Sequence, residues 1–276
     1  MTNEARTRLL AHLGLLFYTA IAVMPVVMII VNSFKTRRAI FGEPVGFPTA
    51  ETFSLIGYST VFERASFELF FANSLIVTLV SLFLVVLTGS MAAHALAEYR
   101  FRGNPLMGLY LALGIMIPIR LGTVSILNLV VSLNLVNTLT ALILVYTAQG
   151  LPLAIFIMTA FMRQVPRSLK DAARVDGMSE YMIYLKVVLP LIRPVVATVA
   201  VFTMIPIWND LWFPLVLAPG DETKTVTLGA QQFIGQFITD WNAILAALSM
   251  AIVPIVVLYV LFSRQLIAGL TSGAVK

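Results

Sequence analysis

The chain alternates between long apolar runs and shorter polar intervals. Runs of mostly apolar residues occupy positions 9–31, 69–97, 106–131, 139–162, 195–217 and 241–263. Each run is long enough for a helix to cross the roughly 30 Å hydrocarbon core of a bilayer. The pattern therefore predicts six transmembrane helices, with both ends of the chain on the same side of the membrane.

Three of these runs contain residues that interrupt a regular helix. Pro118 and Arg120 interrupt the third run, and Pro206 and Pro214 are expected to bend the fifth. Gln149, followed by Gly-Leu-Pro, lies about 15 Å into the fourth run at the rise of an α-helix. Broken backbone at that depth is tolerated only where it is buried in protein or lines a cavity. The fourth run is therefore predicted to break at a point where its backbone is buried in protein or lines a cavity.

Composition favours a membrane protein and excludes several kinds of chemistry. Hydrophobic residues make up 59% of the chain, charged residues 11%, and the mean hydropathy is +0.95, whereas about a quarter of the residues in soluble domains are charged. Cysteine is absent and no G-x-x-x-x-G-K-[ST] phosphate loop occurs. His12 and His94 lack the spacing of metal ligands. The chain is therefore expected to have no catalytic residues, metal or cofactor, so energy for transport must come from an ion gradient or a partner.

One polar segment, residues 165–194, carries dense charge of both signs between the fourth and fifth runs. Ser168 followed by Asp171 is typical of a capping box at a helix start. Gly177 lies where that short helix needs a left-handed stop, and a second short helix is expected over 179–189. The segment is predicted to form two short helices joined at the glycine.

The distribution of Lys and Arg orients the chain. Of the 18 Lys and Arg residues, twelve fall on the side of the termini and of segment 165–194, five fall on the other side, and Arg120 lies within the membrane. The positive-inside rule places the richer side in the cytoplasm. The net charge of +5 thus reflects topology, and no nucleic-acid partner is expected.

The polar segment resembles a known signature. Asp171-Ala172-Ala173, Gly177 and Val187-Val188-Leu189-Pro190 match the pattern EAA…G…I-x-LP, with Asp171 in place of Glu and Val187 in place of Ile. That pattern marks the cytoplasmic coupling loop of ATP-binding-cassette (ABC) importer permeases. Further matches cover nearly the whole chain, at residues 73–75, 99–103, 137–138, 208–210, 269–271 and 273–276. Together they are similar to the second permease subunit of carbohydrate importers of the maltose-transporter type.

This resemblance implies an all-α membrane protein with the six-helix transmembrane domain of a type I ABC importer. It implies an ATP-driven permease for a sugar, oligosaccharide or polyol, in the inner membrane with both termini cytoplasmic. The implied partners are a homologous second permease, two copies of a cytoplasmic ABC ATPase that holds ATP and magnesium, and an extracytoplasmic solute-binding protein. The implied divisions are residues 1–67 (a helix and an outer segment), 68–264 (the transmembrane domain, with its coupling loop at 163–193) and 265–276 (a tail).

The resemblance also assigns residues to the contact with the ATPase. They are Asp171, Ala172, Ala173, Asp176, Gly177, Leu189 and Pro190. Two short helices around a glycine suit a helix-in-groove contact with another protein. The alternative for segment 165–194 is an amphipathic linker that lies on the membrane surface.

Two charges are expected inside the membrane. Helix rise places Arg120 about 21 Å deep and Asp210 about 24 Å deep from the cytoplasmic side. A charge facing lipid costs about 2.5–3.5 kcal/mol or more, so an ion pair or a shared polar cavity is expected. The pair could be structural, or it could belong to a translocation pathway with Gln149 and Asn209. Three aromatic residues nearby could stack on a sugar or anchor the outer membrane interface: Trp208, Trp212 and Phe213.

Another class of function stays open at this point. An ion-coupled secondary transporter would work without an ATPase, through midplane relay residues and an inverted repeat. Only Arg120 and Asp210 offer such a relay, and no convincing repeat is present. A purely structural membrane protein would require neither the interrupted runs nor the spacing within 165–194.

Overall fold

A computed structural model describes residues 3–235 and 239–272. The regular structure of the described residues is helical, apart from two isolated β-bridges. The residues group into two compact units, one drawn from residues 1–68 and 229–253 and the other from residues 69–228 and 254–276. These are called the first and the second unit.

The first unit contains the N-terminal helix and the predicted outer segment. Its elements are α1 (Asn3–Ser33), α2 (Arg37–Gly42), α3 (Ile56–Arg64), the 3-10 turn η3 (Gln231–Phe233) and the first part of α14 (Trp241–Ser272). Lys35 is buried, and its Nζ donates to Asn32 Oδ1 at 3.0 Å and to the Glu43 carbonyl at 2.7 Å. Asn242 Nδ2 in turn donates to the Lys35 carbonyl at 2.7 Å. The predicted outer segment is therefore ordered by contacts with α14, and the contact between Lys35 and Asn242 joins residues 207 positions apart in the chain.

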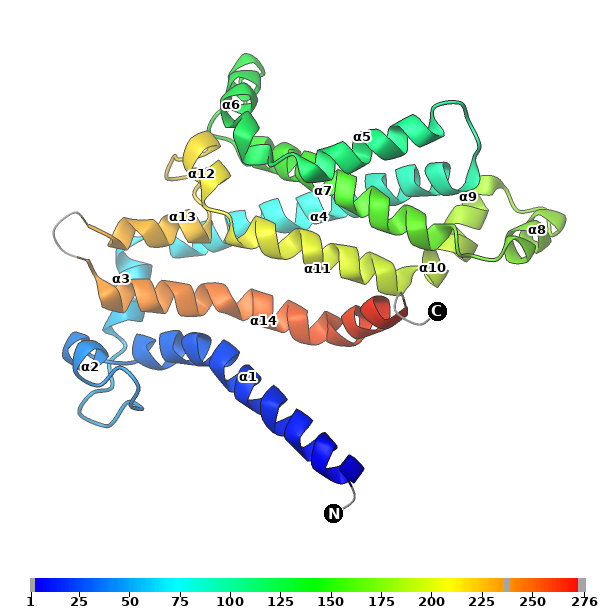
Figure 1. The fold of residues 1–276 in the computed structure, drawn as a ribbon. Coiled ribbons are helices and arrows are strands. Elements are labelled where there is room, and N and C mark those ends of the chain that lie inside the picture. Colours follow the sequence, from blue (N-terminus) through cyan, green and yellow to red (C-terminus); the bar gives the residue numbers. More distant parts are fainter. Residues whose placement is uncertain (1–2, 236–238, 273–276) are drawn as a thin grey trace. The chain divides into compact units, whose positions relative to one another are not determined.

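The second unit holds most of the remaining helices (Figure 1). They are α4 (Phe67–Glu98), α5 (Asn104–Met116), η1 (Ile119–Gly122), α6 (Thr123–Ser132), α7 (Leu139–Met162), α8 (Arg167–Val175), α9 (Glu180–Ile183), η2 (Tyr184–Val188), α10 (Leu189–Leu191), α11 (Arg193–Asn209), α12 (Trp212–Leu217) and α13 (Val226–Ala230). Helix α7 packs against both α5 and α11. Its residues Ala154 and Met158 share a core with Val85 and Ala93 of α4 and with Val199 of α11.

Among the described residues, three helices are long and apolar enough to cross a membrane unbroken. They are residues 7–33 of α1, all of α4, and α7. Two bent pairs raise the number of candidate spans to five, and the described apolar part of α14, Trp241–Val257, is shorter. The sixth predicted span falls on α14, so its crossing of the membrane stays a prediction. Helix α14 continues to Ser272, and positions 273–276 of the resemblance lie outside the described residues.

The third and fifth predicted spans are not continuous helices. Helices α5 and η1–α6 meet at 85° around Pro118, which lacks a backbone N–H and has extended backbone. The fifth span is interrupted at Asp210 and Leu211, between α11 and α12. Pro206 and Pro214, which were expected to bend it, lie inside these two helices instead. The break therefore does not coincide with a proline. It falls at Asp210, whose side chain accepts from the free backbone N–H groups at the start of α12.

Helix α7 corrects another expectation. It has the predicted bounds, Leu139–Met162, with Thr138 as its N-cap, but Pro152 lies inside it without a break. Gly150 lets neighbouring helices approach, since a Cβ there would lie 2.9 Å from Val85 and 3.0 Å from Thr203. The helix continues through Pro152, and in membrane proteins neighbouring helices can compensate for the backbone hydrogen bond that a proline lacks.

Candidate functional site

Segment 165–194 forms the predicted pair of short helices. Helix α8 ends at Val175, and Gly177, which follows its C-cap Asp176, has a φ of +78°, as the expected left-handed stop requires. The N–H of Met178 donates to the carbonyl of Ala173, and the N–H of Gly177 donates to that of Arg174, both at 3.0 Å. These two backbone hydrogen bonds together form a Schellman motif, which ends a helix and reverses the chain direction. The turn at Gly177 therefore follows from local sequence.

The starts of the two helices differ from each other in their capping. Ser179 caps α9, because its Oγ accepts from the N–H of Met182 at 3.4 Å, and the helical stretch begins where predicted. The capping box predicted at Ser168 is wrong: α8 begins at Arg167, and Pro166 occupies the N-cap position. Proline presets the backbone angle for a helix start, so the helix begins before the serine.

The second short helix contains a π-turn that local sequence did not predict. Tyr184–Val188 form η2, in which each turn is wider by one residue than an α-turn. Tyr184 is buried, and its hydroxyl lies 2.7 Å from Ser90 Oγ of α4. Leu189 and Pro190 follow directly in α10 and are half-buried. The loop is thus packed on the C-terminal end of α4.

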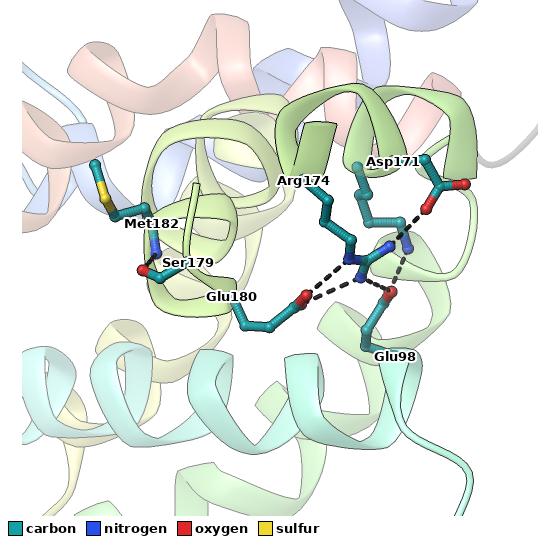
Figure 2. Close-up of polar contacts among 7 residues, drawn as sticks. Glu98, Asp171, Arg174, Ser179, Glu180 and Met182 are labelled. Atoms are coloured by element: carbon teal, nitrogen blue, oxygen red, sulfur yellow. Dashed lines mark hydrogen bonds and ion pairs between the residues drawn. The ribbon is translucent and has the colours of Figure 1, made fainter. Parts of the chain in front are cut away.

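A cluster of ion pairs fixes the two short helices to α4 (Figure 2). Glu98, the last residue of α4, pairs with Lys170 through Oε2 and with Arg174 through Oε1, the latter at 2.9 Å. Arg174 also pairs with Asp171 at 2.6 Å and with Glu180 at 2.7 Å. Charge-assisted hydrogen bonds of this kind are stronger than neutral ones. We call these five residues the Glu98 cluster.

The centre of the Glu98 cluster is largely buried. The side chains of Lys170 and Glu98 are only 7% and 14% exposed, so each charge depends on its partner. The hydrogen bonds that the guanidinium donates to Glu180, Glu98 and Asp171 raise the pKa of Arg174 further above its ordinary value, which keeps the guanidinium charged. The sequence offered no signal for Glu98 beyond its place as a lone acid at the end of an apolar run.

The residues predicted to contact an ATPase do not all face outward. Asp171, Ala172, Asp176 and Gly177 are exposed, whereas Ala173 is buried in the core of the second unit. The guanidinium of Arg174 donates to partners within the Glu98 cluster. Large apolar side chains stand out on the same two helices: Leu169 is 45% exposed, Tyr181 64% and Val175 88%. None of these three was singled out from the sequence.

The predicted ion pair within the membrane is confirmed. Arg120 Nη2 lies 3.1 Å from Asp210 Oδ1. Asp210 also accepts from the Tyr146 hydroxyl at 2.9 Å and from the backbone N–H groups of Trp212 at 3.2 Å and Phe213 at 3.1 Å. The carboxylate is therefore both the ion-pair partner of Arg120 and the N-cap of α12.

The two partners of this pair differ in their surroundings. The Asp210 side chain is 7% exposed, whereas the Arg120 side chain is 65% exposed. Arg120 and Gln149 line a cavity of about 740 Å³ between α5, η1 and α7, while Asn209 and Asp210 do not. The structure thus brings Arg120 and Gln149 to one cavity. Asp210 does not line this cavity but pairs with Arg120, and Asn209 is exposed elsewhere on α11.

The neighbouring aromatic residues correct a further expectation. Trp208 and Phe213 are buried, at 4% and 2% exposure, so neither a sugar nor the membrane interface is open to them in this structure. Phe213 packs edge-on against Tyr146, with ring centroids 6.0 Å apart. Trp212 is half-exposed, and its Nε1 donates to Thr123 Oγ1 at 3.0 Å.

Three residues in the matched positions 73–75 and 137–138 hold one loop at the opposite end of the second unit. Asn73 Nδ2 donates to the carbonyls of Glu222 and Lys224, and Ser74 Oγ accepts from the N–H of Val226 at 2.9 Å. Asn137 adopts a φ of +64° and accepts from the N–H of Gly220 at 2.7 Å. The loop at 218–225 is therefore ordered by the start of α4 and the residues before α7.

Comparison with known proteins identifies the family. Residues 85–270, about two thirds of the chain, match the family described as "Binding-protein-dependent transport system inner membrane component". The chain belongs to this family. The permease is therefore a multi-pass protein of the cytoplasmic membrane and the non-catalytic subunit of an ABC transporter, in which a separate ATPase binds ATP and a binding protein delivers the substrate. This membership overturns the alternative of an ion-coupled transporter that works alone.

Individual relatives resemble the permease over nearly its full length. It is 34% identical to the "Arabinooligosaccharides transport system permease protein AraQ" of Halalkalibacterium halodurans, over 97% of this chain and 96% of that one. It is 33% identical to the "Diacetylchitobiose uptake system permease protein DasC" of Streptomyces coelicolor, over 92% of each chain. A solved bacterial ABC transporter involved in alginate import contains a chain with the same fold, with a TM-score of 0.80, 20% identity, and coverage of 96% of this chain and 98% of that one.

Proposed function

We propose that the permease carries a sugar, oligosaccharide or polyol into the cell. The support is the substrate class named for its relatives, which include uptake systems for arabinooligosaccharides, diacetylchitobiose and melibiose, raffinose and stachyose. In a strain that lacks the permease, uptake of at least one labelled member of a panel of neutral oligosaccharides and polyols should be lost and restored by the gene. Unchanged uptake of the whole panel, together with lost uptake of an amino acid or an inorganic ion, would contradict the proposal.

We further propose that segment 165–194 is the site where the ATPase docks. The observation that carries this proposal is the Glu98 cluster, which fixes two short helices to the end of a membrane-spanning helix. Leu169, Val175 and Tyr181 offer the exposed apolar side chains that a helix-in-groove contact needs. Asp176 adds an exposed carboxylate at the turn beside Gly177.

The cluster also supports a mechanism for the coupling. A docking loop can drive transport only if its movement is transmitted to the helices around the pathway. Buried ion pairs between Glu98, Lys170 and Arg174 resist a separate movement of the loop, so a displacement of α8 would be passed to α4. By resemblance to maltose-type importers, a homologous second permease and two copies of the ATPase would complete the complex.

Removing the charge of Glu98 should uncouple the loop from α4. In Glu98→Gln the buried Lys170 loses its carboxylate, at a cost of about 3–5 kcal/mol for a broken buried pair. We expect a loss of uptake of about tenfold or more, while ATP hydrolysis by the copurified ATPase persists. Glu68→Gln, at the other end of α4 and exposed, is the matched control. Wild-type uptake in Glu98→Gln would contradict a coupling role.

Within the membrane, Arg120 and Gln149 are proposed to line the translocation pathway. The support is the cavity that they share and the high exposure of the Arg120 side chain in this chain. Asp210 would position Arg120 through their ion pair and would not itself contact the substrate. Asn209, on the exposed side of α11, has no place in this cavity, so its proposed role in the pathway has the least support.

The orientation is proposed from charge: both termini and segment 165–194 lie in the cytoplasm, and the loop at 218–225 lies outside. The natural absence of cysteine allows single labels without background. Asp221, whose side chain is 88% exposed, and Ser168, which is also exposed, are suitable positions. Asp221→Cys should react with an impermeant thiol reagent on intact cells, and Ser168→Cys should react only after permeabilisation. The opposite pattern would invert the orientation.

A further inference from the structure

A basic pocket lies in the second unit beside segment 165–194. It is a cavity of about 520 Å³ between the end of α4, the residues that lead into α5, and the junction of α7 with α8. Its cationic lining residues are Arg100, Arg163, Arg167 and Lys170, and the one carboxylate that lines it is Glu98. Glu98 is already paired with Lys170 and Arg174. Within the described part of the chain, the three arginines therefore have no carboxylate partner.

An apolar cavity adjoins this pocket. It has a volume of about 270 Å³ and shares Leu96, Asn104 and Arg163 with the basic pocket. Its other lining residues are contributed by α5 and α7: Gly108, Leu111, Phe156, Thr159 and Ala160. The two cavities together form a site that is cationic at one end and apolar along the other.

A buried hydroxyl in the apolar cavity gives a second indication of a ligand. Thr159 is 9% exposed, and its Oγ1 has no hydrogen-bond partner among the described residues. Thr147, on the same helix, bonds in the usual way to the carbonyl four residues earlier. Buried hydroxyl groups are ordinarily hydrogen-bonded, so Thr159 indicates an acceptor from outside the chain.

We propose that these two cavities bind one anionic glycerophospholipid. Its phosphate lies against Arg100, Arg163 and Arg167, since guanidinium groups match phosphate oxygens geometrically. The first part of an acyl chain lies along Leu111 and Phe156, and the Thr159 hydroxyl donates to an ester carbonyl. Basic pockets between transmembrane helices are known to hold anionic lipid headgroups.

Neighbouring residues fit a position at the membrane surface. Tyr99 and Phe101, which also line the basic pocket, are half-exposed aromatic residues, a type that gathers at lipid–water interfaces. Arg167 is the first residue of α8, and Arg163 directly follows α7. A lipid bound here would therefore contact the segment that we propose docks on the ATPase. The site itself does not depend on that docking.

Lipid binding can be measured directly on the full chain, purified in mild detergent together with the subunits that accompany it. Native mass spectrometry would compare phosphatidylglycerol with phosphatidylcholine. We expect phosphatidylglycerol to bind about tenfold tighter or more, and the Arg100→Gln/Arg167→Gln variant to lose that preference. Both arginines are exposed, so their replacement should not affect folding. Arg102→Gln, in the same loop but outside the pocket, is the matched control and should bind as the unmodified chain does.

A second variant tests the apolar cavity without changing charge. Gly108 lines the cavity, and a Cβ there would have no heavy atom within 4 Å, so Gly108→Leu places a new apolar side chain at the cavity from an open position. We expect it to weaken phosphatidylglycerol binding several-fold. Gly14→Leu, at another open helical glycine, is the control. Equal binding of the two lipids, or unchanged binding in the double arginine variant, would overturn the proposal. Full competition by glycerol 3-phosphate with no effect of Gly108→Leu would assign the site to a soluble phosphate instead.

Discussion

Replacing Asp210 with leucine is expected to lower the free energy of unfolding by about 3–5 kcal/mol. The change removes the acceptor of the buried Tyr146 hydroxyl and of two backbone N–H groups at the start of α12. Each unsatisfied buried donor costs about 1–3 kcal/mol. The midpoint of thermal unfolding in detergent should therefore fall by on the order of 10 °C.

Replacing Arg120 should have a smaller effect than replacing Asp210. In Arg120→Leu the carboxylate keeps three donors, and the lost partner was itself 65% exposed. Asp210→Asn retains an acceptor for the helix cap, so its stability should resemble that of Arg120→Leu. The exposed neighbour Asn209, changed to leucine, is the positional control.

A double-mutant cycle separates the two roles of Asp210. If Arg120 and Asp210 form the pair that the structure describes, the double leucine variant should be about as unstable as Asp210→Leu alone. A full recovery is not expected, because the second substitution cannot restore the helix cap. Strictly additive losses would contradict the pair. If Arg120 lines the pathway as proposed, Arg120→Gln should fold normally but transport more slowly.

Replacing Gly177 with valine is expected to leave the permease in the membrane but to impair coupling. The φ of +78° at Gly177 is unfavourable for residues with a Cβ by about 1–2 kcal/mol, and more so for a β-branched side chain. That strain is enough to shift the turn between α8 and α9 about tenfold away from its native geometry. Uptake and the amount of copurified ATPase should both fall by about that factor or more.

The matched control for this variant is Gly177→Asn. A Cβ at Gly177 would meet no heavy atom within 4 Å, so neither side chain clashes with a neighbour. Asparagine tolerates the left-handed conformation much better than valine does. The asparagine variant should therefore keep most of its uptake. An equal loss of uptake in the valine and asparagine variants would contradict this explanation. It would show that any side chain at position 177 disrupts the contact, whatever backbone angle it prefers.

The sequence by itself determined the features that depend on near neighbours. The length of the apolar run predicted the bounds of α7, and Pro118 indicated the break in the third run. The glycine stop at Gly177 was also readable, because a left-handed residue involves only the adjacent helical turn. Family membership followed from the ordered spacing within 165–194 together with the matches elsewhere in the chain.

The tertiary structure decided where interrupted helices break and which charges meet. Pro152 and Pro206 lie inside their helices without ending them, and Pro214 lies in the first turn of α12, where a proline is tolerated. The fifth run instead breaks at Asp210, where a carboxylate replaces the missing helical hydrogen bonds.

The Glu98 cluster shows the same limit of local sequence most clearly. Glu98 and Lys170 are 72 residues apart in the chain, and nothing near either residue indicates the other. Their pairing depends on how α4 packs against the two short helices around Gly177. Helical periodicity predicts which face of a helix is apolar, but the partner of that face is set by the packing of the whole unit.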